Sequence, residues 1–205
     1  MPAKTKPAIE GKTGSMPKLP DKEDNRQVFH MTFGLLMVIF AIIAGKTNAE
    51  FGLIAIILTG LTIANSKLLG WKNEQIDYFL KKYERDVNFP GKGALMLTIG
   101  MLFALVFSKT FEMAIATMAI LAIGDGVSTI IGKRGKISLP WNNKKTIEGT
   151  AAFAISAILP AFYFTPSPYL ALAIAAIFAF IESIDVFIDD NLSIPMTGAI
   201  LSHLI

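Results

Sequence analysis

Seven apolar stretches constrain the fold of this 205-residue chain more than any other feature of its sequence. Polar connections separate them, and they cover roughly residues 28–44, 49–64, 93–107, 111–131, 147–164, 169–184 and 194–205. A helix needs about 20 residues to cross the hydrocarbon core of a bilayer, and in lipid its backbone groups must bond one another. The pattern therefore predicts an all-α, polytopic integral membrane helix bundle. Because the last stretch is short, we expect six or seven transmembrane helices.

The composition agrees with a membrane domain, since 53% of the residues are hydrophobic and only 17% are charged. In soluble proteins about a quarter of the residues are charged. The chain has no cysteine, which excludes a disulfide framework and thiolate chemistry. Its aromatic residues do not interleave with the basic loops, so we expect no nucleic-acid partner. Residues 1–25 are polar and hold four prolines, which predicts a disordered cytoplasmic tail before a membrane-embedded domain at 26–205.

The positive charges predict how the helices are oriented. Of the 19 Lys and Arg residues, all except Lys46 and Lys109 fall in the tail, in the loop 65–92 or in the loop 132–146. The positive-inside rule places these segments, and by parity the acidic segment 185–193, in the cytoplasm. In the first loop, Ile76, Phe79 and Tyr83 recur at helical spacing, which favours an amphipathic helix lying in the membrane interface.

The fourth apolar stretch contains a carboxylate, Asp125, close to its cytoplasmic end. An ionisable residue within a membrane span is costly and is by default functional. Glycines let backbone N–H groups approach phosphate oxygens, and lysines neutralise phosphate charge. The neighbours of Asp125 that offer these properties are Gly124, Gly126, Ser128, Gly132, Lys133, Arg134, Gly135 and Lys136. In the alternative interpretation, the glycines only let helices pack closely and the basic run is a cytoplasmic loop.

Further polar clusters fall at the same cytoplasmic ends and supply the other groups that triphosphate chemistry needs. A divalent cation such as Mg²⁺ can be held by Asp125, Asp189 and Asp190. Lys144 and Lys145 can stabilise the transferred phosphate. Glu148, or one of the aspartates, can act as the base. The remaining candidate site residues at this leaflet are Arg26, His30, Glu84, Gly91, Lys92, Gly93, Thr146, Glu182 and Asn191.

Several of these clusters also have a purely structural interpretation. Arg26 and His30 lie four residues apart at a helix start and suit an interfacial pair as well as a site. The run 90–93 suits a turn before a span, and the run 189–191 suits an Asx-type turn. A soluble-type P-loop motif is absent from the sequence.

The order of these motifs resembles the CTP-dependent polyprenol kinase family, which includes dolichol kinase, phytol kinase and CTP-dependent diacylglycerol kinase. The resemblance spans about residues 26–195 and rests on Gly-Asp-Gly-x-Ser at 124–128, on Lys-Lys-Thr-x-Glu-Gly at 144–149 and on the segments around 26–30, 84–94 and 189–195. It implies an integral membrane enzyme that transfers the terminal phosphate of CTP to a lipid alcohol and uses a divalent metal.

Phosphatidate cytidylyltransferases share the Lys-Lys-Thr-x-Glu-Gly run, so a CTP-dependent cytidylyltransferase is the alternative function. Their Gly-rich, Asp-Arg-x-Asp signature is not found in this sequence. A small membrane transporter is a third class, but it needs polar residues through the middle of the spans, and few are present. We therefore expect a kinase for a polyprenol, a dolichol-like or related isoprenoid alcohol, or diacylglycerol. It would reside in a plasma membrane or an endoplasmic-reticulum-type membrane, with its active site facing the cytoplasm.

The charge map predicts opposite locations for two exposed positions. In Lys81→Cys the new thiol lies in a basic loop, whereas in Ser167→Cys it lies in a connection without Lys or Arg. An impermeant thiol reagent should therefore label them from opposite faces of sealed vesicles. Labelling of both positions from the same face would contradict the map.

Overall fold

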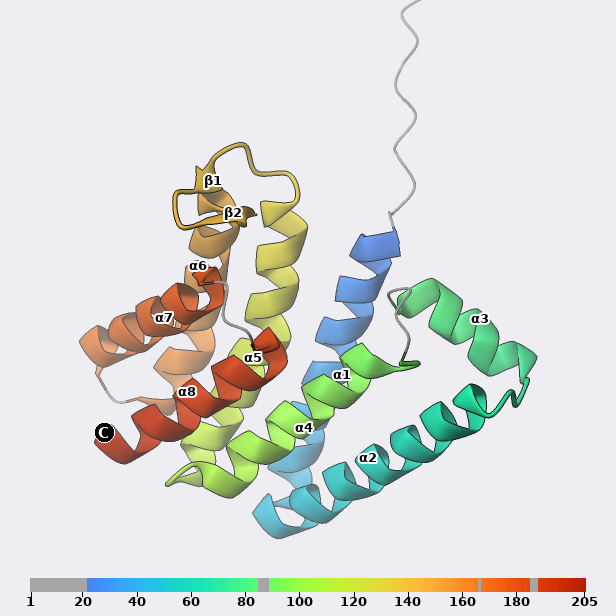
Figure 1. The fold of residues 1–205 in the computed structure, drawn as a ribbon. Helices are drawn as coiled ribbons and strands as arrows, with labels where there is room; N and C mark the ends of the chain where they lie inside the picture. Colours follow the sequence, from blue (N-terminus) through green and yellow to red (C-terminus); the bar gives the residue numbers. More distant parts are fainter. Residues whose placement is uncertain (1–21, 85–88, 166, 185–187) are drawn as a thin grey trace, which may run out of the picture.

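The computed structural model describes residues 22–84, 89–165, 167–184 and 188–205, and this part of the chain is almost entirely helical (Figure 1). It contains eight helices and one short hairpin: α1 (Lys22–Ala44), α2 (Lys46–Leu68), α3 (Glu74–Tyr83), α4 (Lys92–Phe107), α5 (Phe111–Gly132), β1 (Ser138–Leu139), β2 (Asn142–Thr146), α6 (Ile147–Phe164), α7 (Pro168–Ser183) and α8 (Asp190–Leu204). The all-α architecture predicted from the sequence is confirmed.

Each of the seven apolar stretches became one helix, and the structure extends several of them at their polar ends. Helix α1 begins at Lys22, so residues 22–25, predicted as part of a disordered tail, are helical instead. Glu23 and Asp24 lie in this first turn, where negative charge complements the helix dipole, and Glu23 accepts a hydrogen bond from Arg26 Nε (3.1 Å). Residues 1–21 of the predicted tail lie outside the described residues.

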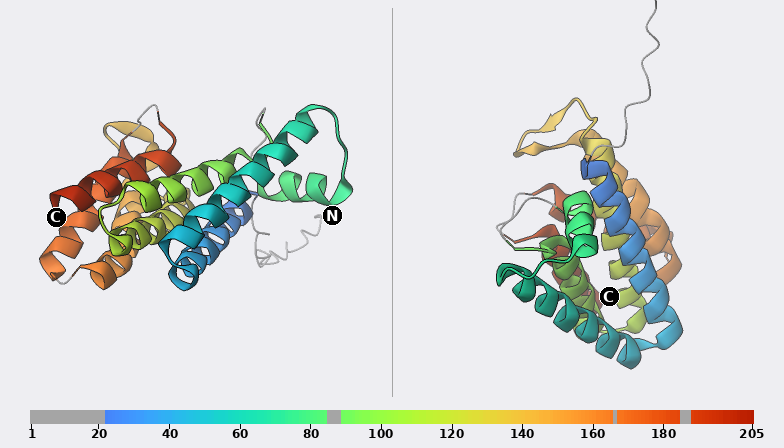
Figure 2. Two further views of the ribbon diagram at one scale, coloured as in Figure 1. Left: turned by 90° about the horizontal axis from the view of Figure 1, so that it is seen from below. Right: turned by 90° about the vertical axis from the view of Figure 1, so that its right-hand side faces the viewer.

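Helix α5 is the axis of the bundle, with its neighbours packed around it (Figures 1 and 2). Small residues let these neighbours come close, as in other membrane helix bundles. A Cβ atom on Gly34 of α1 would lie 2.7 Å from Ala122 Cβ, and one on Gly198 of α8 would lie 2.2 Å from Thr117 Oγ1. Helices that are distant in sequence therefore pack directly on α5.

The connection from α5 to α6 contains the only strands in the described residues. Strands β1 and β2 pair antiparallel, with Ser138 opposite Thr146 and Leu139 opposite Asn142, and the register shifts between the two pairs. The hairpin lies at the end of α5 and α6 where both helices meet (Figure 1). Sequence reasoning predicted only a basic loop here, because two-residue β1 and lysine-rich β2 carry no apolar alternation.

Three helices, α1, α2 and α5, are long and apolar enough to cross a membrane, while α4, α6 and α7 are shorter apolar helices. The count of six or seven spans therefore stays a prediction. Helix α2 carries large exposed apolar side chains such as Phe51 and Leu58. An apolar surface of this extent suits a lipid environment.

The amphipathic helix predicted in the loop 66–90 is present as α3, and its position in the membrane interface stays a prediction. Asn73 caps it by accepting a hydrogen bond from the Ile76 N–H group (3.1 Å). Its apolar side packs on α1, where the Phe29 ring lies 4.9 Å from the Phe79 ring and 5.3 Å from the Tyr83 ring, measured between centroids. Helix α3 is thus attached beside the start of α1.

Candidate active site

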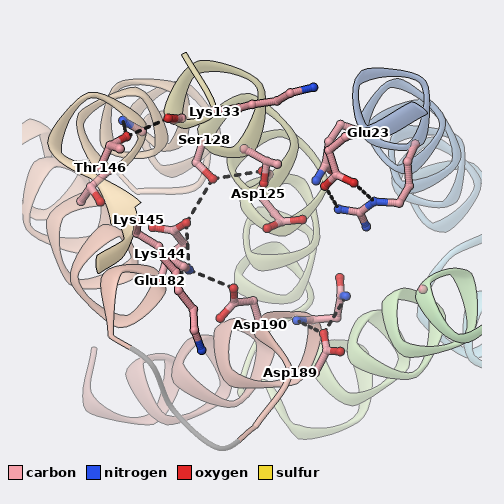
Figure 3. Close-up of a pocket in the computed structure, with 18 of the residues that line it drawn as sticks. Glu23, Asp125, Ser128, Lys133, Lys144, Lys145, Thr146, Glu182, Asp189 and Asp190 are labelled. Carbon is pink, nitrogen blue, oxygen red and sulfur yellow. Dashed lines mark hydrogen bonds and ion pairs between the residues drawn. The ribbon is translucent and has the colours of Figure 1, made fainter. Parts of the chain in front are cut away.

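A polar cavity of about 660 Å³ lies where α1, the start of α4, α5, α6, α7, α8 and the hairpin meet (Figure 3). This volume is in the range of small-molecule sites in proteins. The residues that line it are Glu23, Arg26, Gln27, Glu84, Lys92, Gly93, Asp125, Ser128, Thr129, Gly132, Lys133, Lys144, Lys145, Thr146, Gly149, Thr150, Glu182, Ile184, Ile188, Asp189, Asp190 and Asn191. Each of the polar clusters that were predicted to lie at one leaflet therefore contributes residues to a single cavity.

Six carboxylates line this cavity, and three of them come from three different helices on the side next to the hairpin: Asp125 of α5, Glu182 of α7 and Asp190 of α8. The Glu182 side chain is 6% exposed and that of Asp125 is 15% exposed. Ser128 Oγ, one helical turn from Asp125, lies 3.1 Å from Glu182 Oε1 and can donate a hydrogen bond to it. Negative charge is thus concentrated in a largely desolvated place, which favours the entry of a cation.

Lys145 on β2 supplies positive charge in direct contact with two of these carboxylates. Its Nζ atom lies 3.0 Å from Glu182 Oε1 and 3.0 Å from Asp190 Oδ2 (Figure 3). Burial lowers the pKa of Lys145, but the two carboxylates outweigh burial and hold that pKa above its usual value. Burial raises the pKa of Asp190, the first residue of α8, to about 6, although Lys145 opposes the rise. The uncharged form of Asp190 is therefore more favoured here than in an exposed aspartate.

The hairpin holds Lys145 in this position through two anchors on the end of α7. Asn142 is buried, and its Nδ2 group donates to the Ser183 carbonyl oxygen (3.1 Å) while its Oδ1 atom accepts from the Lys144 N–H group (3.1 Å). The Trp141 Nε1 group donates to Ser183 Oγ (3.2 Å). The lysine-bearing strand is thereby fixed against the helix that carries Glu182.

Thr146 fixes the other end of the same strand. Its Oγ1 atom caps α6 by accepting from the Gly149 N–H group (3.2 Å), and it donates to the Gly132 carbonyl oxygen (3.2 Å). A Cβ atom on Gly149 would lie 2.9 Å from Gly132 Cα, so α5 and α6 touch backbone to backbone here. This contact brings β2 directly over the end of α5.

Unpartnered polar atoms concentrate in the walls of the cavity. In the described part of the chain, six buried side-chain polar atoms have no hydrogen-bond partner, and four of them belong to cavity residues: Gln27 Oε1, Thr150 Oγ1, Glu182 Oε2 and Asn191 Oδ1. A fifth, His30 Nε2, lies 3.6 Å from Asp125 Oδ2. Because buried polar groups in proteins nearly always have partners, this concentration indicates a polar ligand.

The acidic residues fit a phosphate-bound cation better than a preformed metal cage. Among the described residues, no group of three His, Cys, Asp or Glu side chains is close enough to hold a metal ion. Asp189, one of the predicted ligands, caps α8, and its Oδ1 atom accepts from the Asn191 N–H group (3.1 Å). Glu182 and Asp190 nevertheless converge on one point. Mg²⁺ commonly binds through one or two carboxylates plus substrate phosphates. Glu182 and Asp190 can provide the two carboxylates.

Some predicted site residues have a structural role outside the cavity lining. Glu148, predicted as a catalytic base, accepts hydrogen bonds from the N–H groups of Lys136 (2.8 Å) and Ile137 (3.3 Å). Arg134 pairs with Asp24 of α1 (2.7 Å between Nη2 and Oδ2). These contacts hold the loop after α5 in place.

Three of the predicted phosphate-binding glycines serve close packing, as the alternative interpretation stated. Gly124 faces the Phe153 ring, Gly126 faces Met31, and Gly135 faces Thr146 Oγ1.

The predicted residues before α4 are also structural. Gly91 precedes α4 in the left-handed conformation (φ 75°). Glu84 accepts from the N–H groups of Gly93 (3.4 Å) and Ala94 (3.3 Å), so it caps α4 while it faces the cavity. Gly93 and Lys92 line the cavity beside it.

Comparison with known proteins places this chain in a family. No family model matches the chain, and no solved structure matches it. Uncharacterized protein MJ1137 of Methanocaldococcus jannaschii is 34% identical over 192 residues, which cover 90% of this chain and 95% of that protein. The chain belongs to the same family as MJ1137.

This chain is also similar to plant kinases of the polyprenol type. Probable phytol kinase 2, chloroplastic, of Oryza sativa subsp. japonica is 28% identical over 88% of this chain and 66% of its own length. Farnesol kinase, chloroplastic, of Arabidopsis thaliana is 28% identical over 90% of this chain and 66% of its own length. The chain thus spans about two thirds of these plant proteins. The resemblance to polyprenol-type kinases is confirmed, whereas its dolichol kinase branch stays a prediction.

Sequence reasoning missed several lining residues, most clearly Gln27, Thr150 and Glu23. Gln27 is 1% exposed on α1 and lies at the polar start of the helix, where nothing in the sequence distinguished it from the other polar residues. Thr150 directly follows the Lys-Lys-Thr-x-Glu-Gly run. Glu23 was not considered as a site residue because it falls within the segment predicted as disordered.

The anchoring of the hairpin leads to a direct test. Asn142→Ala removes the bonds to Ser183 and Lys144 and leaves a buried carbonyl without its donor, which costs about 1–3 kcal/mol. We expect faster amide hydrogen exchange across residues 138–146, measured by mass spectrometry. The matched control is Asn143→Ala, at the exposed neighbouring position. Equal exchange in the two variants would contradict the anchoring role.

Proposed function

We propose that this chain is an isoprenoid-alcohol kinase that transfers the terminal phosphate of CTP to a lipid alcohol in the polar cavity. The similarity to phytol and farnesol kinases indicates a kinase with an alcohol acceptor. The observation that carries the site is the convergence of Glu182, Asp190 and Lys145 inside a membrane-type helix bundle. The activity is proposed for the part of the plant proteins that this chain spans.

The cavity residues divide into groups with complementary charge. Lys144 and Lys145, with Lys133 and Arg26 on the same cavity, would bind the phosphate oxygens. Glu182 and Asp190, together with the phosphates, would hold a divalent cation, which would neutralise and orient the phosphates when it is bound. Ser128 orients Glu182 through its hydroxyl group. Of the predicted nucleotide-binding residues, Ser128, Gly132, Lys133, Thr146 and Lys92 line the cavity.

The transfer step forms one bond and breaks one. The oxygen of the alcohol attacks the terminal phosphorus, and the bond between that phosphorus and the bridging oxygen of the leaving nucleoside diphosphate breaks. The proton of the hydroxyl group goes to a carboxylate, for which we propose Asp125, since Glu148 is bonded to the loop backbone. His30, 3.6 Å from Asp125, is placed to accept that proton in turn.

The membrane setting separates the two substrates. The nucleotide would enter from the cytoplasmic side, where the basic residues gather, and the lipid alcohol would enter from the bilayer between apolar helices. The cytoplasmic orientation, the six or seven spans and the use of CTP belong to this proposal. The choice of CTP over ATP rests on the resemblance to CTP-dependent kinases.

Product analysis tests the reaction class. The purified protein is incubated with farnesol, phytol or geranylgeraniol, Mg²⁺ and CTP labelled at either the terminal or the innermost phosphate. We expect the terminal label on the lipid and release of CDP. In a parallel incubation with a lipid phosphate in place of the alcohol, pyrophosphate together with a CDP-lipid would establish the alternative cytidylyltransferase. Equal turnover with ATP would contradict the proposed donor.

Substitution of Asp125 tests the site. Asp125→Asn keeps the shape of the side chain and removes its charge, so the bundle should fold and phosphate transfer should fall roughly 100- to 1000-fold. The control is Glu112→Gln, an exposed position in the first turn of α5, about 20 Å from Asp125 along the helix at its usual rise per residue.

Turnover and thermal stability are measured for both variants in one detergent. Wild-type turnover in Asp125→Asn, or loss of turnover in Glu112→Gln with retained folding, would show that the transfer site lies elsewhere.

A further inference from the structure

The ammonium group of Lys145 lies where acidic side chains from two helices meet. Its Nζ atom is 3.0 Å from Glu182 Oε1 and 3.0 Å from Asp190 Oδ2, and it also donates to the Glu182 carbonyl oxygen (Figure 3). Three oxygen atoms from the ends of α7 and α8 thus surround one positive charge. Hard divalent cations such as Mg²⁺ and Mn²⁺ also take oxygen ligands of this kind.

Lys145 leaves binding capacity in this cluster unused. Glu182 is 4% exposed, and its second carboxylate oxygen, Oε2, has no hydrogen-bond partner. The Oε1 atom of Gln27, on α1 and also in the cavity wall, has none either. Both atoms are buried acceptors, and a buried acceptor without a partner is unusual in a folded protein. The cluster is therefore arranged for a cation that binds more oxygens than the ammonium group does.

We propose that Lys145 is an internal cation that competes with a divalent cation for Glu182 and Asp190, and that a nucleoside triphosphate relieves this competition by binding Lys145 through its phosphates. Two cations at contact distance from the same carboxylate oxygens repel one another strongly. Phosphate oxygens offer the lysine an alternative partner. This inference rests on the proposed function, because it assigns the triphosphate to the same cavity.

The backbone around Lys145 suits a movement of the side chain alone. Asn142 ties β2 to α7, and Thr146 ties it to the end of α5. Because both ends of the strand are fixed, the flexible four-carbon stem of the lysine can swing while its Cα atom stays in place. The consequence is reciprocal coupling: the nucleotide raises the affinity for the divalent cation, and the cation raises the affinity for the nucleotide by the same factor.

Mn²⁺ binding to the full-length protein in detergent tests this competition without any measurement of turnover. The bound fraction is followed by electron paramagnetic resonance in the absence of nucleotide. Lys145→Met removes the charge and keeps a stem of similar length, so Mn²⁺ affinity should rise roughly tenfold or more even at an effective dielectric constant of about 20. The matched control is Lys92→Met, which deletes a charge from the same cavity at a lysine without an ion pair among the described residues. It should change Mn²⁺ affinity little.

The second measurement uses the wild-type protein with a CTP analogue whose terminal phosphate cannot be transferred. The protein and the analogue together should bind Mn²⁺ more tightly than either the protein alone or the analogue alone. Lys145→Met should lose most of this increase in Mn²⁺ affinity. Unchanged or weaker Mn²⁺ affinity in folded Lys145→Met without nucleotide would overturn the competition. If Lys145→Met does not fold, absence of coupling in the wild-type protein overturns the proposal.

The two proposals can fail separately. Tighter Mn²⁺ binding by Lys145→Met, together with no effect of the analogue on any variant, would leave the competition standing and contradict the nucleotide site. If the analogue raises Mn²⁺ affinity while Lys145→Met has the same Mn²⁺ affinity as the wild-type protein, the nucleotide site stands and the competition is contradicted.

Discussion

Charge compensation inside an apolar helix bundle is the constraint on which the rest of this structure depends. Asp125, Glu182 and Asp190 gather in one cavity, and Lys145 is the cation in contact with two of them. A buried charge without a partner is strongly destabilising, so each member of this cluster requires the others to be placed accurately. Burial raises the pKa of Asp190 to about 6, and Lys145 opposes this rise.

The backbone features around the cavity serve this placement. Close contacts such as that between Gly132 and Gly149 let α6 and the hairpin approach the end of α5. Asn142 fastens the hairpin to α7, and Asp189 caps the start of α8 beside the cavity. Because these three features come from distant parts of the sequence, the cavity exists only when the whole bundle has assembled. A site of this kind is preorganised, as electrostatic catalysis requires.

Much of the fold was predictable from the sequence, because apolar length sets the helix positions almost alone. The polar clusters were also predicted to share one leaflet, and the structure brings Asp125, Lys145 and Glu182 into one cavity. The contacts of individual site residues could not be predicted, because helical spacing does not give what a residue faces. Glu148, predicted as a base, accepts hydrogen bonds from the loop backbone, and Gly124, predicted as a phosphate contact, packs against Phe153.

The hairpin could not be predicted for a related reason: its stability comes from tertiary anchors on Ser183 and not from its own alternation of residues. Gln27 was missed because its importance lies in burial without a partner, which only coordinates reveal. The similarity to phytol and farnesol kinases adds the reaction class to this picture and leaves the position of the triphosphate to be measured.

Photo-cross-linking with a triphosphate that carries a reactive group on its terminal phosphate measures that position most directly. The account predicts adducts on β2 (Asn142–Thr146) and on the end of α5, and excess CTP with Mg²⁺ should suppress them. Peptide mapping by mass spectrometry identifies the labelled residues. Adducts confined to α2, to α3 or to the connection 108–110 at the far end of α5, suppressed equally by CTP, would contradict the central claim that this cavity binds the transferred phosphate.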